Sequence, residues 1–286
     1  MRLINSQEVA AMLLRPRQRR LSSGEIRRRA DLAALRLVAA YGHCTISDWA
    51  HSIYPNGKYA TQSAQRLAKR LCGHSPPLCA VRRNSLAGRS FVLTRPGAAY
   101  LEVRGVQAHH GMDLDSVAGP TFRHHAIVSR FCQVQELAGV KAWTEYAISQ
   151  GQAPLSQREV LELCGKVPDA ILLGPTGELT AVECESSPKG FGALKKAIKS
   201  VERAGHVSIG GITLAGCVFV FDASQNHRGR IARVAKAVWK SLQPEERAAL
   251  VKRISLASAE IGYPLVFRSW RTEPLVLPPV ATQERT

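Results

Sequence analysis

Three carboxylates lie in line within one acidic stretch of a chain that is otherwise strongly basic. Asp169 precedes an apolar run, and Glu183 and Glu185 stand at the end of the next run, beyond a turn-forming segment at 174–177. Side chains alternate across a strand, so Glu183 and Glu185 share one face, and the returning strand can bring Glu183 beside Asp169. Clustered carboxylates repel one another unless a cation lies between them, and hard divalent ions prefer oxygen ligands. We therefore expect Asp169, Glu183 and Glu185 to bind Mg²⁺ or Mn²⁺ for phosphodiester chemistry. The alternative is a solvated hairpin edge that carries acids.

The distribution of charge favours the first interpretation. The net charge is +17 and the pI is about 10.1, which indicates a polyanionic partner, most simply nucleic acid. Residues 1–30 carry eight Arg against two Glu, whereas residues 141–186 hold seven carboxylates against three basic side chains. A metal-dependent DNA enzyme needs both features, because phosphates are gripped in one place and the cation is held in another.

Cysteine usage and hydropathy bear on the compartment. The seven cysteines contain no CxxC pair and their number is odd, which argues against a disulfide framework and a structural zinc site. Adjacent histidines at 109–110 and 124–125 do not face one another, so they do not favour zinc either, although one of His124 and His125 is a candidate for the active site. The longest uncharged apolar stretch, 209–221, is too short to span a bilayer, and no signal peptide is evident. We expect a bacterial cytoplasmic protein without membrane insertion.

The N-terminal third has the pattern of three helices followed by a hairpin. Apolar periodicity predicts helices at 24–42 and 59–72, with a short helix between them that opens at capping-box spacing over 45–48. Two β-like runs, 78–82 and 90–93, follow and are joined by an Arg-bearing loop. This is the order of a winged helix, which places one helix in the major groove of DNA; the alternative is a winged helix that contacts protein. The residues expected to contact phosphates and base edges are Thr61, Gln62, Gln65, Arg66, Lys69, Arg70, Arg82, Arg83 and Arg89.

The remaining chain resembles the core of the PD-(D/E)XK nuclease fold, which includes restriction endonucleases. Its expected order is a helix at 122–137, a strand at 140–148, the acidic hairpin, a helix at 193–204, a strand at 214–221 and a helix at 229–242. The resemblance rests on the PD dipeptide ending at Asp169 and on the run from Glu183 to Glu185. In that family the two acids hold the metal and a following Lys helps to activate water. Here Glu185 stands where the Lys is expected, so either Lys189 supplies the ammonium, or the site needs a different base or does not cleave.

A winged helix followed by this core is similar to a narrower group, the plasmid replication-relaxation proteins and the MobC-type relaxases of mobilisable and conjugative elements. The resemblance covers roughly residues 24–222 and is one of order and motif. It implies an acidic site of Glu145, Asp169, Glu183 and Glu185, and site-specific nicking at a transfer or replication origin. The nucleophile is either activated water or a tyrosine, of which Tyr146 is nearest in sequence.

The expected fold class is α/β (α+β), with an N-terminal winged helix and a restriction-endonuclease-like domain that has a mixed central sheet. The predicted parts are a basic arm (1–23), the winged helix (24–104), a linker (105–119), the nuclease-like domain (120–243) and a C-terminal helix with an extended tail (244–286). Expected partners are double-stranded DNA, locally melted at an origin, other mobilisation or replication proteins, and a second copy of the chain. The alternative function is a non-catalytic DNA-binding accessory or replication protein with a degenerate nuclease core. A transcriptional regulator would fit the winged helix but leaves the acids unexplained.

Overall fold

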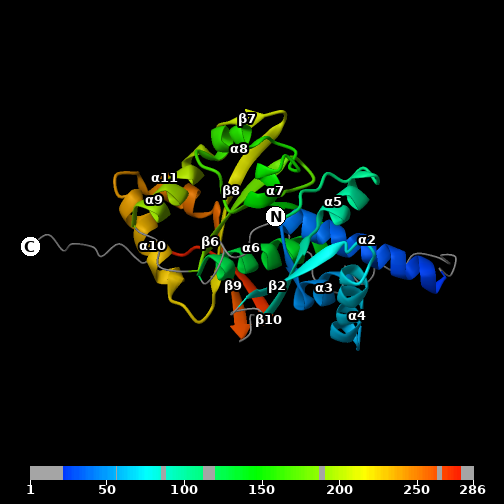
Figure 1. The fold of residues 1–286 in the computed structure, drawn as a ribbon. Coiled ribbons are helices and arrows are strands. Elements are labelled where there is room, and N and C mark those ends of the chain that lie inside the picture. Colours follow the sequence, from blue (N-terminus) through cyan, green and yellow to red (C-terminus); the bar gives the residue numbers. More distant parts are fainter. Residues whose placement is uncertain are drawn as a thin grey trace, which may run out of the picture. The chain divides into compact units, whose positions relative to one another are not determined.

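A computed structural model describes residues 22–55, 57–84, 88–111, 120–186, 191–262 and 266–277 (Figure 1). The chain is a mixed α/β protein that divides into two compact units. Unit 1 comprises residues 1–122 and 129–153, and unit 2 comprises residues 123–128 and 154–286. The helix α6 (Pro120–Leu137) therefore contributes its second turn to unit 2 and most of its length to unit 1.

Three helices form the first part of unit 1. They are α2 (Ser23–Tyr41), α3 (Ile46–Ile53) and α4 (Ala60–Cys72). Capping boxes begin α2 and α3, because the Ser22 and Thr45 side chains each accept a hydrogen bond from the third backbone N–H of the helix. The chain leaves α2 at Gly42 with φ 77°, a conformation that glycine adopts without strain. One face of α4 is buried, as its apolar spacing predicts: Ala64, Leu67, Ala68 and Leu71.

A three-stranded antiparallel sheet completes the core of unit 1. Its order is β1 (Cys44–Thr45), β3 (Gly88–Leu93), β2 (Cys79–Asn84). The fully buried Trp49 ring of α3 stacks on Phe91 of β3 at a centroid distance of 4.6 Å. Further elements of this unit are α5 (Arg95–Glu102), β4 (Lys141–Thr144) and α7 (Glu145–Ser149). The first part of the predicted linker is packed, since Val106 and Ala108 belong to this core.

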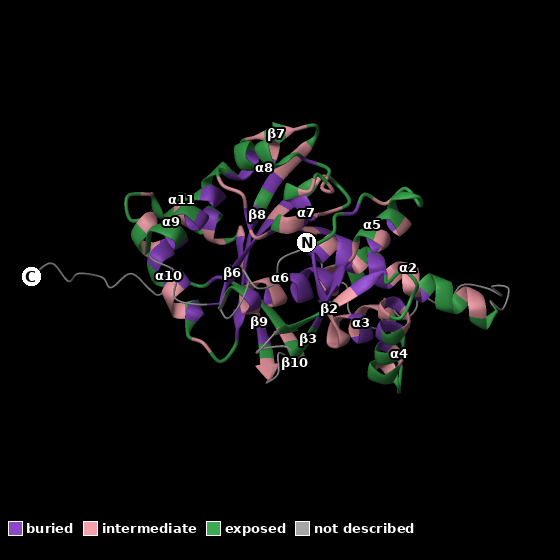
Figure 2. Ribbon diagram, viewed as in Figure 1, coloured by how far each residue is buried: buried purple, intermediate pink, exposed green. Residues whose placement is uncertain are grey.

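Unit 2 is organised around a mixed sheet with the strand order β10-β9-β8-β6-β5, and β7 pairs with β8. β5 and β6 form an antiparallel hairpin, whereas β6, β8 and β9 run parallel. β6 is covered on both faces, because its consecutive residues 181–185 are all buried (Figure 2). The strands are β5 (Ala170–Leu173), β6 (Glu178–Glu185), β7 (Ser208–Ile209), β8 (Ile212–Asp222), β9 (Ile254–Gly262) and β10 (Val266–Pro274). The helices are α8 (Gln157–Cys164), α9 (Phe191–Ser200) with the short 3₁₀ turn η1 (Val201–Arg203), α10 (His227–Val238) and α11 (Pro244–Val251).

Two expectations about these elements are wrong. The strand predicted over 140–148 ends at Thr144, because its side chain accepts a hydrogen bond from Ala147 N and so caps the helix α7. Of the C-terminal helix and extended tail predicted at 244–286, the helix is present as α11, whereas the described part of the tail forms β9 and β10, with β9 parallel to β8 within the sheet. All seven cysteines are free, as the absence of a pairing pattern predicts. Among the described residues, no helix combines the length and the apolar character needed to cross a membrane.

Candidate active site and nucleic-acid interface

The hairpin β5–β6 brings Asp169 to the end of β6. In the hairpin register Ala170 is paired with Val182, so Asp169, which directly precedes β5, lies beside the last residues of β6. The contact is direct, since Asp169 Oδ2 accepts a hydrogen bond from Cys184 N at 2.7 Å. A carboxylate that accepts a backbone N–H is fixed in orientation and favoured in its ionised form.

Glu183 is buried against a lysine that the sequence motif did not single out. Glu183 is 1% exposed, and its Oε2 lies 2.6 Å from the Nζ of Lys166. Lys166 follows α8, which Gly165 terminates in the left-handed conformation with φ 74°. The Lys166 side chain is 28% exposed, so the ion pair joins a buried carboxylate to a side chain that reaches solvent.

The second turn of α6 supplies a histidine to the same site. His124 Nε2 lies 3.1 Å from Asp169 Oδ1, on the oxygen that Cys184 N does not use. The neighbouring residue of α6, Arg123, forms an ion pair with the buried Asp222 at the end of β8. This ion pair fixes the helix turn that presents His124 to Asp169.

Glu185 is also 1% exposed, and it pairs with Phe221 in the parallel register of β6 and β8. The alternative of a solvated hairpin edge is therefore wrong: Glu183 and Glu185 are both buried on a strand that has neighbours on either side. Within the described ranges, no three or more His, Cys, Asp or Glu side chains are grouped so as to hold a metal ion. Instead, basic side chains contact two of the acids: Lys166 at Glu183 and His124 at Asp169.

The sequence offers three further catalytic candidates, Glu145, Tyr146 and Lys189. Glu145 belongs to unit 1, where it is exposed in the first turn of α7 rather than on a strand. Tyr146 is in the same short helix, and burial raises the pKa of its phenol. Lys189 lies outside the described residues. Burial, with a smaller effect of the Glu183 charge, raises the pKa of the Cys164 thiol to about 12, which disfavours its thiolate form.

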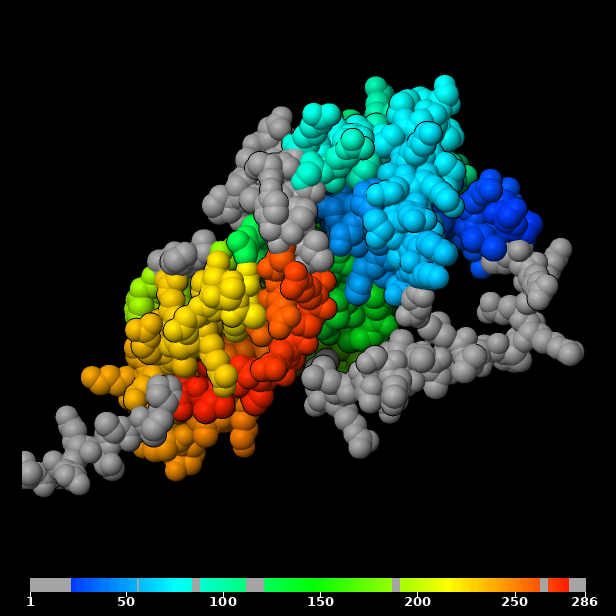
Figure 3. Space-filling model, turned by 90° about the horizontal axis from the view of Figure 1, so that it is seen from below, coloured from blue at the N-terminus to red at the C-terminus, as the bar shows by residue number. Residues whose placement is uncertain are grey.

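The predicted nucleic-acid residues in unit 1 lie on α4 and on the β2–β3 hairpin. Figure 3 shows the light-blue and cyan segments that contain them next to each other on the surface, and β2 contacts α4. The exposed residues of this set are Thr61, Gln62, Gln65, Arg66, Lys69, Arg82, Arg83 and Arg89. Arg70 differs, because its Nε and Nη2 both bond Asp31 Oδ1, at 3.2 and 2.5 Å. Its guanidinium therefore fastens α4 to α2.

The β2–β3 hairpin places two arginines opposite each other. Arg83 is paired with Arg89 in the antiparallel register, and both side chains are exposed. Like charges at directly opposite positions destabilise a strand pair, and an anion bound between them removes that repulsion. Comparisons of the chain with protein-family models, with curated proteins and with solved structures found no match.

Proposed function

We propose that the chain is a metal-dependent endonuclease that nicks DNA at a transfer or replication origin, with the reacting groups in unit 2. The observation that carries the proposal is the contact between Lys166 and the buried Glu183, next to Asp169 in the same hairpin. Two acids and a lysine are the set that the PD-(D/E)XK resemblance calls for. The lysine in this set is Lys166. The family's lysine position lies two residues after the second acid, where this chain has Glu185.

The donor set fits a hard divalent cation. Mg²⁺ is typically bound by one or two carboxylates together with water molecules and substrate phosphates, so a group of three acids is not required. Asp169 and Glu183 would hold the ion, and Glu185, two residues further along β6, would complete its ligand shell. When bound, Mg²⁺ or Mn²⁺ would polarise the phosphate and stabilise charge on the leaving oxygen.

The side chains of this chain have separate tasks in such a reaction. The Lys166 ammonium, which is paired with Glu183 and partly exposed to solvent, would orient an attacking water and stabilise negative charge on the phosphate. His124 and the backbone N–H of Cys184 each take one oxygen of Asp169 and so hold the carboxylate in one orientation. Burial of Glu183 and Glu185 limits water around the acids, which strengthens their interaction with a cation.

The arrangement of unit 2 supports this assignment. A helix whose second turn contacts the acids, the antiparallel hairpin that carries them, a helix and a strand parallel to the second hairpin strand occur in the chain order α6, β5–β6, α9 and β8, with β4, α7 and α8 between α6 and β5 and with η1 and β7 between α9 and β8. Unit 1 would recognise the DNA as a winged helix. Its helix α4 would enter the major groove, and the β2–β3 hairpin, with Arg83 and Arg89, would be the wing that contacts phosphate.

A nicking assay on supercoiled plasmid tests the proposal. The plasmids carry fragments of the genetic element that encodes the chain, and nicked circles are scored with Mg²⁺, with Mn²⁺ and with EDTA. We expect nicking that requires the metal, and its loss in Glu183→Gln and in Asp169→Asn. Both variants should retain DNA affinity, because neither residue belongs to the proposed DNA-reading face. Nicking that persists in Glu183→Gln would rule out this site.

A second candidate is a DNA-binding accessory protein that does not cleave. It is favoured by the ion pair of Lys166 with Glu183, which already offsets part of the charge of the acids. The two functions differ in their response to metal. An enzyme that binds Mg²⁺ in the folded state melts at a higher temperature when Mg²⁺ is added, and Asp169→Asn removes the shift. An accessory protein binds DNA with neither a metal-dependent shift nor nicking.

A further inference from the structure

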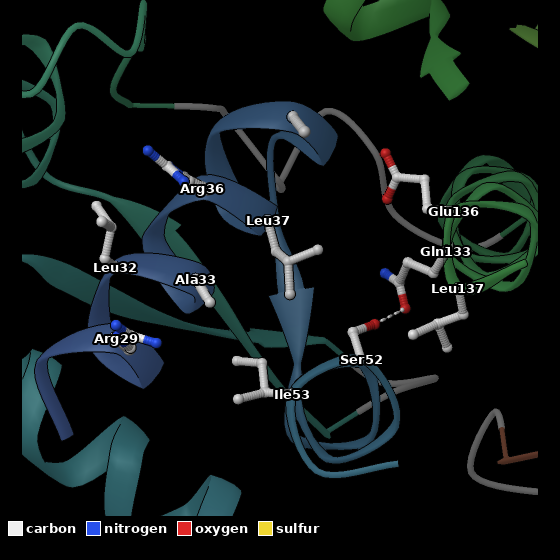
Figure 4. Close-up of a pocket in the computed structure, with 11 residues that line it drawn as sticks. Arg29, Leu32, Ala33, Arg36, Leu37, Ser52, Ile53, Gln133, Glu136 and Leu137 are labelled. Atoms are coloured by element: carbon white, nitrogen blue, oxygen red, sulfur yellow. Dashed lines mark hydrogen bonds between the residues drawn. The ribbon is translucent and has the colours of Figure 1, made fainter. Parts of the chain in front are cut away.

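A pocket of about 510 Å³ lies within unit 1, between α2, the end of α3 and the C-terminal part of α6 (Figure 4). Sites for small molecules typically have volumes of roughly 300–1,000 Å³, so the pocket has the size of a ligand site. Its apolar wall is made of Leu32, Ala33, Leu37, Ala40, Ile53 and Leu137. These side chains would cover an apolar body of modest length.

A buried amide in the pocket wall has an unused donor. Gln133 is 1% exposed, and its Oε1 accepts a hydrogen bond from the Ser52 hydroxyl at 3.0 Å. Its Nε2 is buried and has no hydrogen-bond partner among the described residues. Figure 4 shows the amide nitrogen turned from α6 towards the side chains of α2 across the pocket. A buried donor without a partner costs free energy, and a ligand oxygen at this point would remove that cost.

The charged residues of the pocket favour an anion. Arg29 and Arg36 line it from α2, two helical turns apart and therefore on the same face, and both are exposed. Neither forms an ion pair with another residue of the described ranges. The acid in the lining, Glu136, accepts the Tyr41 hydroxyl at 2.7 Å, and burial raises its pKa. The arginines thus remain available to a carboxylate at the mouth of the pocket.

We propose that this pocket binds a small carboxylate with an apolar body, such as a medium-chain acyl or an aromatic acid. The apolar body lies on the leucines of α2, the carboxylate accepts a hydrogen bond from Gln133 Nε2, and the positive charges of Arg29 and Arg36 attract it. The site belongs to unit 1 and does not depend on nicking by unit 2.

Calorimetric titration of the full chain with sodium octanoate tests the proposal, with acetate and 1-octanol as probes that lack the apolar body or the charge. We expect octanoate to bind and both controls to bind at least about tenfold more weakly, because acetate has no apolar body to bury and 1-octanol has no charge for the arginines to attract. Equal binding of acetate and octanoate would mean general attraction of anions to a basic protein, and would overturn the pocket.

Variants locate the binding. Arg36→Glu and Gln133→Leu should each weaken octanoate about tenfold. Arg28→Glu makes the same charge change on α2 outside the pocket lining and should leave affinity unchanged. Ala33→Trp places a large side chain from α2 into the pocket and should abolish octanoate binding. The melting temperature of this variant should stay near that of the native chain. Octanoate binding that survives Ala33→Trp, or an equal loss in Arg28→Glu, would contradict the assignment.

Discussion

At the scale of single residues, the contact between Lys166 and Glu183 decides how the acidic stretch can be used. A buried carboxylate is costly unless a positive charge or several donors compensate it, and Glu183 is 1% exposed with an ammonium at 2.6 Å. Lys166 is only three residues before Asp169, but it lies 17 residues before Glu183. The contact forms only when the hairpin folds, so no local sequence pattern indicates it. The motif pointed instead to two alternatives, an ammonium from Lys189 or a site that needs a different base or does not cleave.

A comparison of the two lysines tests which one acts. We expect Lys166→Ala to reduce nicking by about 10²–10⁴-fold, the usual contribution of a positioned acid–base group, and Lys189→Ala to leave it nearly unchanged. Rates are measured on supercoiled plasmid at saturating Mn²⁺. Lys166→Ala should also lower the free energy of unfolding by about 1–3 kcal/mol, because it removes a charged hydrogen bond from a buried group. The opposite ranking of the two lysines would return the role to Lys189.

At the scale of elements, α4 separates a buried apolar face from an exposed polar one, and this division was predictable from 3.6-residue periodicity alone. The exposed face carries Gln62 and Gln65, whose amides can read base edges, and Arg66 and Lys69, which suit phosphates.

The proposed reading helix is tested by discrimination between DNA sequences. Gln62→Ala and Gln65→Ala should weaken binding to the nicked sequence by about 1–3 kcal/mol each and leave binding to scrambled duplex nearly unchanged. Lys69→Ala should weaken both duplexes alike and reduce the dependence on salt, because a phosphate contact carries no sequence information. Binding is measured at two salt concentrations. If the glutamine variants lose affinity equally for both duplexes, α4 does not read bases.

The approach of β8 to the segment before β9 depends on Gly216. A Cβ at this position would lie 2.2 Å from the carbonyl oxygen of Arg253. That oxygen already accepts a hydrogen bond from Cys217 N at 2.9 Å. We expect Gly216→Ala to lower the free energy of unfolding by about 1–3 kcal/mol or more, as overpacking does, in urea titrations. Gly192→Ala in α9 is the matched control, since no atom lies within 4 Å of its Cβ. It should stabilise by roughly 0.5–1 kcal/mol, because alanine is the better helix former.

At the scale of the whole molecule, buried histidines couple stability to pH. Burial lowers the pKa of His43, His51 and His227 below the ordinary value of 6.5. Below that pH the unfolded chain binds protons that the folded chain does not, so the free energy of unfolding falls as the pH drops. Each proton changes it by up to about 1.4 kcal/mol per pH unit.

Urea titrations between pH 7 and pH 5 check this coupling. The native chain should lose stability on acidification, and His43→Phe should flatten the slope, because His43 is 3% exposed and its ring already lies against Phe122. His109→Phe is the control, since His109 is exposed. An unchanged slope in His43→Phe would mean that His43 does not resist protonation in the folded state.

The local elements follow from the amino-acid pattern of the chain. Apolar periodicity, capping-box spacing and the turn at 174–177 were enough to predict α2, α3, α4, the β2–β3 hairpin and β5–β6 close to their observed bounds, because short-range forces decide these features. Local patterns failed where a single side chain ended a strand, at Thr144, and where strands joined a sheet late in the chain, at β9 and β10.

What surrounds the acids depends on contacts between distant parts of the chain. Lys166, His124 and the backbone of Cys184 reach Glu183 and Asp169 across separations of 15 to 45 residues, and Glu183 and Glu185 pair with β8 beyond the last residue of β6 that pairs with β5. The pocket in unit 1 likewise needs α2, α3 and α6 together. Such contacts depend on how distant elements pack, and packing is selected by the total burial of the fold rather than by the pattern within any one segment.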